Sequence, residues 1–98
     1  MPQNRLFTFV GFAVKSRNVI YGVDNLISAK RKPEVILFSE SLGENSRKSL
    51  VAYADKNMIE RYEVNLDEIL SGKNCKALGI TDRHLADAVK SEIKESRI

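Results

Sequence analysis

The sequence predicts an α/β fold, a three-layer α/β/α sandwich whose segments follow the order α-β-α-β-α-β-α-β-α. Two observations lead to this prediction. Segments with helical and strand-like patterns alternate along the chain, and Val35–Phe38 is a continuous apolar run, which is typical of a strand covered by helices on both faces. The chain has 98 residues, of which 43% are hydrophobic and 30% are charged, so we expect a single globular domain over residues 1–98.

The N-terminal segments are expected to form a helix and then a short strand. A helix is predicted over residues 5–15, because its apolar positions recur at i, i+3, i+4 and i+7 and are Leu6, Phe9, Val10 and Ala13. Phe7 and Phe12 lie off this stripe, where they can contact a second surface or a partner. Val19–Tyr21 combines β-branched and aromatic residues and is predicted to be a strand.

A second helix is predicted after Gly22, which ends this strand, and is expected to run to about Ala29. Asp24 has a side chain suited to the N-cap of that helix. Pro33 disfavours helical geometry at the preceding Lys32, so the helix must end before it.

The middle of the chain is expected to continue the alternation after the buried strand. A third helix should start at Asn45 or Ser46, with an apolar face made of Leu50, Val51, Ala54 and Met58. Residues 61–64 are predicted to form a strand. Asn65 followed by Glu68 resembles a capping box and predicts the start of a short helix.

The C-terminal part is expected to hold one more strand and one more helix. Gly72 suits the position after a helix C-terminus. Ala77–Ile80 is predicted to be the fourth strand, and Thr81 or Asp82 is expected to cap the last helix. The apolar stripe of that helix comprises Leu85, Ala88 or Val89, and Ile93.

The sequence contains no recognisable catalytic constellation. His84 is the only histidine, and a solvated side chain at the start of the last helix is its simplest interpretation. Cys75 is the only cysteine, and we interpret it as a small core or edge residue. A glycine-rich phosphate loop with its lysine is absent. We therefore expect a protein that is not an enzyme and that uses neither a metal nor another cofactor.

The sequence also lacks targeting signals. No run of about 18 apolar residues is present, as a transmembrane helix would require. The N-terminus does not show the pattern of a secretory signal. These observations predict a cytoplasmic protein.

Charge is distributed unevenly along the chain, although the net charge is only +3. Residues 1–33 hold six basic and one acidic side chain (6 − 1 = +5), and residues 34–72 hold four and eight (4 − 8 = −4). Residues 73–98 hold six and four (6 − 4 = +2). This distribution allows one face to meet phosphates while another stays solvated, although small proteins often show such fluctuations.

The basic segment around Gly22 is the strongest candidate site. A glycine before a helix lets another backbone approach closely, and the helix start offers unpaired N–H groups with a partial positive charge. Lys15 and Arg17 flank this segment and are expected to hold phosphates, while Asn18 can hydrogen-bond base edges.

Other polar residues of this segment have two interpretations each. Asp24 and Asn25 can contact RNA bases, but Asp24 can equally act only as a helix cap. Lys30, Arg31 and Lys32 are more simply explained as charges that stabilise a helix C-terminus than as direct contacts.

Three groups of motifs resemble a known family. Residues 11–24 (GFAVKSRNVIYGVD) resemble the opening signature of the ribosomal kink-turn-binding superfamily, of the L-seven-Ae and L-thirty-e type, and in particular its small bacterial YlxQ-like members. The strand Val35–Phe38 and the following SESLGENSRK are similar to that group's strand, loop and helix start. Residues 79–82 (GITD), with Leu85 and Ala86, are similar to its last strand and helix. The resemblance covers about residues 6–93, and it depends on the order and spacing of these motifs together.

The resemblance implies a four-stranded mixed sheet within the sandwich, and RNA binding without catalysis. In this family the glycine turn and the start of the second helix contact RNA, assisted by the loop before the last strand. The RNA-binding residues that it implies here are Lys15, Arg17, Asn18, Gly22, Asp24, Asn25, Lys73 and Asn74. Typical kink-turn binders have an Asn-Glu pair where Asp24 and Asn25 stand, and a lysine in place of Ser28. The kink-turn specificity therefore stays open.

Two functions follow as hypotheses. The first is a monomeric, cytoplasmic RNA-binding protein that acts on structured RNA, with ribosomal RNA as the first candidate and ribosomal or translation proteins as further partners. The second is a protein–protein interaction module on the same fold, which would use Phe7, Phe12 or the acidic residues 34–72.

Overall fold

Strand β4 (Ala77–Ile80) lies inside a four-stranded sheet of order β1-β4-β2-β3. In the computed structural model, which describes residues 4–70 and 75–96, β4 pairs antiparallel with β1 (Val19–Tyr21) and with β2 (Val35–Phe38). Strand β2 pairs parallel with β3 (Glu60–Glu63). The sheet is therefore mixed, as expected.

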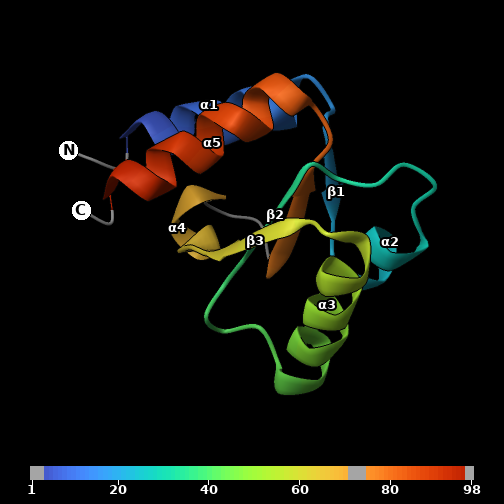
Figure 1. The fold of residues 1–98 in the computed structure, drawn as a ribbon. Coiled ribbons are helices and arrows are strands. Elements are labelled where there is room, and N and C mark those ends of the chain that lie inside the picture. Colours follow the sequence, from blue (N-terminus) through green and yellow to red (C-terminus); the bar gives the residue numbers. More distant parts are fainter. Residues whose placement is uncertain (1–3, 71–74, 97–98) are drawn as a thin grey trace.

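Helices cover both faces of this sheet (Figure 1). Helices α1 (Asn4–Lys15) and α5 (Arg83–Ser96) lie side by side and pack on one face together with α4 (Leu66–Ile69). Helices α2 (Val23–Ser28) and α3 (Glu44–Asn57) pack on the other face. The predicted α/β/α sandwich and its element order are confirmed.

The apolar core consists of two layers, one on each face of the sheet. Because successive side chains of a strand point to opposite faces, Val35 and Leu37 of β2 join the layer beneath α1 and α5, whereas Ile36 and Phe38 join the layer beneath α2 and α3. All four residues of β2 and all four of β4 are buried. The continuous apolar run of β2 thus reflects burial on two sides.

The start of α2 and the start of α3 differ from the predictions. The N-cap of α2 is Gly22, and Asp24 lies in the first helical turn, so the prediction of Asp24 as the N-cap is wrong. Helix α3 begins at Glu44 after Gly43, one residue before the earlier of the two predicted starts. Neither helix has a side-chain hydrogen bond at its N-cap, so the local side-chain chemistry did not reveal these boundaries.

Strand β3 begins one residue earlier than predicted because of the way α3 ends. Met58 adopts the left-handed conformation (φ 57°), and its N–H donates to the carbonyls of Ala54 and Asp55. This closure turns the chain sharply, so buried Ile59 reaches the core and Glu60 already pairs with Val35. Methionine rarely adopts this conformation, so no local sequence pattern predicts it.

The caps of α4 and α5 are confirmed. Asn65 accepts a hydrogen bond from the Glu68 N–H at 3.3 Å, and its side-chain amide donates to the Glu68 carboxylate at 3.0 Å. Asp82, one of the two predicted caps of α5, accepts from the Leu85 N–H at 2.9 Å. The predicted role of Gly72 falls outside the described residues. Within residues 4–70 and 75–96 no helix combines the length and the apolar character needed to cross a bilayer.

Gly79, in the middle of β4, lets α2 approach the sheet closely. A Cβ atom at this position would clash with Leu26 Cδ2 of α2 and would lie 2.9 Å from Pro33 Cβ. Leu26 and Pro33 are both buried, so neither has free space to move into. The close packing of this layer therefore requires a residue without a side chain.

We expect Gly79→Ala to lower the free energy of unfolding by about 1–3 kcal/mol, the usual cost of overpacking a core. Urea denaturation measures this change. The matched control is Gly11→Ala in α1, where a Cβ would meet nothing within 4 Å; it should be neutral or stabilise by up to about 1 kcal/mol, because alanine is the better helix former. Equal stability of Gly79→Ala and the wild type would contradict this account of the packing.

Candidate nucleic-acid interface

The residues predicted to bind RNA lie at the two ends of β1. The residues before the strand are Lys15, Arg17 and Asn18. Those after the strand are Gly22, Asp24 and Asn25. At about 3.3 Å per residue along a strand, Asn18 and Gly22 are roughly 13 Å apart, so these residues form two groups and not one corner. Lys73 and Asn74 lie outside the described residues.

Gly22 is held in a conformation that favours glycine. Its backbone has φ 89° and ψ 148°, a region that other residues rarely adopt. A Cβ atom there would meet only the Asn25 side-chain amide, at 3.9 Å, so the backbone conformation and not a close contact explains the glycine. Its N–H donates to Ala77 O at 2.9 Å, which fixes the start of α2 against β4.

The first turn of α2 offers little positive charge. Asp24 is exposed in that turn. Its carboxylate stabilises the N-terminus of the helix but would repel a phosphate. The Asn25 side-chain amide donates to Tyr21 O at 2.8 Å and is thus already engaged. No basic residue occurs within α2. The glycine corner therefore presents polar groups suited to bases more than to phosphates.

Three segments that precede or follow strands are joined at the opposite end of β1. Thr81, just after β4, donates its N–H to Asn18 O at 2.8 Å, and its carbonyl accepts from Arg31 Nη2 at 3.1 Å. The Glu34 N–H donates to Ile80 O at 2.7 Å. These bonds hold residues 15–18, 30–34 and 80–83 together at one end of the sheet.

These three segments gather six exposed cationic side chains, which we call the basic end: Lys15, Arg17, Lys30, Arg31, Lys32 and Arg83. None of the six forms an ion pair with a residue of the described ranges. Two acidic residues lie in the same segments; Glu34 is exposed, and Asp82 caps α5. The basic end thus carries a formal excess of four positive charges (6 − 2).

The turn before β1 presents two of these cations. Lys15 ends α1, and Arg17 follows in the left-handed conformation, with φ 61°. The backbone N–H groups of Ser16, Arg17 and Asn18 donate to carbonyls of α1, which fixes the turn. The Asn18 side chain donates to Ser16 Oγ at 2.8 Å. The position of Asn18 in this network indicates that it supports the turn.

Part of the basic end does not follow from the sequence pattern. Lys30, Arg31 and Lys32 were expected to stabilise the C-terminus of a helix, but α2 ends at Ser28 and has no basic residue in its last turn. Arg31 instead bonds to Thr81, 50 residues further along the chain. Arg83 was not singled out at all. The run of three cations was a visible signal, whereas the proximity of Arg83 depends on the strand order.

Several acidic residues in the middle of the chain form ion pairs. Glu63 pairs with Arg47 at 3.2 Å, and Asp55 pairs with Arg61. Glu60, at the start of β3, contacts Lys90 of α5 at 2.9 Å. This hydrogen bond, helped by the neighbouring charges, lowers the pKa of Glu60 below its ordinary value of 4.5. Four of the eight acidic residues in 34–72 are thus paired, whereas the cations of the basic end have no such partner among the described residues.

The two residues considered for chemistry lie apart. His84 is exposed on α5. Cys75 is half-buried before β4, and its thiol donates to Ala77 O at 2.9 Å. Across the part of the chain that the structure describes, no group of three or more His, Cys, Asp or Glu residues is arranged to hold a metal ion.

Comparison with protein-family models gives no match, and comparison with curated proteins gives none either. Solved structures do match. One is described as "The structure of a protein with unknown function from Bacillus halodurans C"; it superimposes with a TM-score of 0.83 over 92% of this chain and 97% of that chain, at 17% sequence identity. This likeness shows the shared fold.

We predict that Glu60→Gln makes the protein less stable in a pH-dependent way. A carboxyl group whose pKa is lowered by folding stabilises the protein at pH values above its pKa in the unfolded chain, near 4.5. This contribution is lost as the pH falls through the lower pKa of the folded state. At pH 7 the loss should be roughly 0.2–1 kcal/mol, as for other exposed pairs.

Chemical denaturation at several pH values tests this prediction. The difference between Glu60→Gln and the wild type should shrink below pH 4.5. The control Glu95→Gln removes an exposed carboxylate of the same α5 region and should change the free energy of unfolding by less than about 0.5 kcal/mol. A Glu60→Gln difference that stays constant from neutral to strongly acidic pH would show that the ion pairs do not stabilise the fold.

Proposed function

We propose that this chain is a non-enzymatic, cytoplasmic RNA-binding protein that holds the backbone of a structured RNA with its basic end. The observation that carries this proposal is that hydrogen bonds join three separate segments with six exposed cations, none of which forms an ion pair within residues 4–70 and 75–96. Lysine and arginine contacts to phosphates supply most of the affinity in such complexes. A surface built in this way suits a polyanion better than a single small anion.

The position of β1 suggests how the two predicted groups of residues work together. Strand β1 lies at an edge of the sheet, with β4 as its neighbour. An RNA that lies along this edge would place phosphates on Lys15 and Arg17 and unpaired bases beside Asp24 and Asn25. The exposed Asp24 carboxylate can accept a hydrogen bond from a base amino group. The resemblance to kink-turn binders supports the same arrangement, and ribosomal RNA remains the first candidate.

A protein partner is the second candidate function, because α1 exposes an aromatic side chain. Phe12 is 53% exposed, while Phe7 of the same helix is half-buried. An exposed aromatic residue is a common anchor at protein interfaces. Affinity purification after nuclease treatment separates the two functions: a protein that is retained by the wild type and lost with Phe12→Ala would favour the interaction module.

We expect Lys15→Ala and Arg17→Ala each to weaken RNA binding and to reduce the salt dependence of the binding constant. Each cation removed from a phosphate should lower the slope of log K against log salt by about 0.7–0.9. Fluorescence anisotropy with a kink-turn RNA and with a plain hairpin of equal length measures affinity, slope and preference for the kink together.

The matched control is Lys48→Ala, which removes the same charge from an exposed position on α3, where Lys48 lies 3.8 Å from Glu44. This control should leave both affinity and slope unchanged. If the double variant Lys15→Ala/Arg17→Ala binds RNA with the wild-type salt slope, the basic end does not hold the phosphates and the proposal fails.

A further inference from the structure

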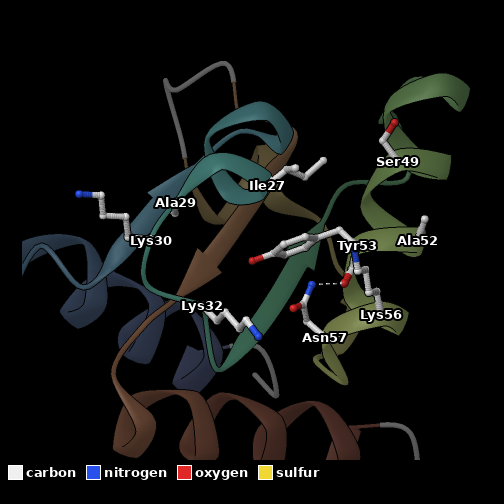
Figure 2. A pocket seen from close by; sticks show the side chains of 9 residues that line it. All are labelled: Ile27, Ala29, Lys30, Lys32, Ser49, Ala52, Tyr53, Lys56 and Asn57. Atoms are coloured by element: carbon white, nitrogen blue, oxygen red, sulfur yellow. Dashed lines mark hydrogen bonds between the residues drawn. The ribbon is translucent and has the colours of Figure 1, made fainter.

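A groove lies between the α2–β2 segment and α3, on the face of the sheet that α2 and α3 cover (Figure 2). Its volume is about 570 Å³, which is in the range of small-molecule sites. One wall consists of the end of α2 and the loop that follows it, and the other consists of the second half of α3. Lys30 and Lys32 belong both to this groove and to the basic end.

The charge of the groove favours an anion. Lys30 and Lys32 contribute from the loop and Lys56 from α3, and all three are exposed. Within the described ranges none of them forms an ion pair, and the lining contains no acidic residue. Lys32 and Lys56 create a positive potential at the groove that a phosphate would lower. The Lys30 side chain extends away from Tyr53 and α3 (Figure 2).

The surface between these lysines is apolar, so a phosphate alone would not fill the groove. Ile27 is 43% exposed there, and Ala29 and Ala52 add small apolar side chains from the two walls. Removing an isoleucine exposed to this extent from water would contribute favourably to the free energy of ligand binding. The occupant should therefore combine an anionic group with a flat or apolar body.

Two polar groups near the middle of the groove can select that body. The Tyr53 hydroxyl is buried and has no hydrogen-bond partner among the described residues, an arrangement that is unfavourable in the free protein. Figure 2 shows the Tyr53 ring reaching from α3 toward the opposite wall, between Ile27 and Lys32. The Asn57 side-chain amide donates to the backbone carbonyl of Tyr53 at 2.9 Å, and the side-chain oxygen of Asn57 remains available as an acceptor.

We propose that this groove binds one unstacked nucleotide of RNA. Lys32 and Lys56 hold its phosphate, the base lies against Ile27 and Ala52, and Asn57 hydrogen-bonds the edge of the base. The Tyr53 hydroxyl, which is buried in this structure, turns toward the base and gains a hydrogen-bond partner there. Unstacked bases held by apolar contacts and edge hydrogen bonds are the usual basis of specific RNA recognition. This inference rests on the proposed function in one respect: the RNA held at the basic end supplies the nucleotide. A free nucleoside monophosphate shares the same chemistry.

The test compares two RNA hairpins that differ only in their loop, one with its bases present and one abasic. Ala52→Phe fills the groove from an exposed position on α3 without changing the charge. Tyr53→Phe removes only the hydroxyl. We expect the wild type to prefer the hairpin with loop bases by roughly fivefold or more. Both variants should reduce this preference while leaving the affinity for the abasic hairpin unchanged.

Thermal denaturation of the same variants separates recognition from folding. Tyr53→Phe should melt no lower than the wild type, because the hydroxyl that it removes has no hydrogen-bond partner in the described part of the chain. Lys15→Ala should weaken binding of both hairpins equally. A preference for loop bases that survives both Ala52→Phe and Tyr53→Phe, or a wild type without any preference, would overturn the groove as a nucleotide site but leave the proposed function standing.

If the protein binds neither hairpin, the proposed function is overturned. Titration with free nucleotides then tests the groove independently of RNA. Titration of the isotope-labelled full chain with uridine or adenosine 5′-monophosphate should shift the amide signals of Ile27, Lys32, Tyr53 and Asn57. The absence of such shifts, or equal shifts with Ala52→Phe, would reject the groove as a nucleotide site.

Discussion

The hydrogen bonds at the end of β4 determine which surfaces of this protein come together. Thr81 bonds to Asn18 through its N–H and to Arg31 through its carbonyl, and Ile80 bonds to Glu34. Because β4 runs antiparallel to both β1 and β2, its last residues lie beside the first residues of both neighbours. Each of those strands follows a basic segment. The topology itself therefore concentrates positive charge at one end of the sheet.

This concentration of positive charge carries an electrostatic cost. Like charges at an exposed surface repel one another, although water and salt weaken the repulsion. Glu34 and Asp82 offset only two of the six positive charges, and Glu60, Glu63 and Asp55 are each paired with a lysine or an arginine elsewhere. A surface whose cations have no ion-pair partner among the described residues is suited to an anionic partner.

The sequence was sufficient for most of the fold, because the strands have strong local patterns. The strands Val19–Tyr21, Val35–Phe38 and Ala77–Ile80 follow from β-branched, aromatic or apolar runs, and all three occur as predicted. The start of β3 did not follow, because it depends on Met58 taking a left-handed conformation. Nor did the role of Gly79 as a contact point for α2, since the register that brings Leu26 above it is a tertiary property.

The candidate site was less accessible to sequence reasoning. Lys15 and Arg17 could be singled out from local charge, but their separation from Gly22 by the length of β1 became clear only in three dimensions. Asp24 was expected to be the N-cap of α2, whereas Gly22, with its positive φ, occupies that position. The groove with Tyr53 had no sequence signal, because its two walls come from separate segments. The burial of the Tyr53 hydroxyl without a partner among the described residues is a property of packing.

Lysine acetylation footprinting with and without a structured RNA tests the central claim most directly. The chain provides its own internal controls, since Lys48 and Lys94 lie near acidic partners away from the basic end. If the basic end holds the RNA backbone, Lys15, Lys30 and Lys32 should become protected while both controls keep their reactivity. Equal protection of all lysines, or protection of the controls alone, would contradict the claim that this end of the sheet is where RNA binds.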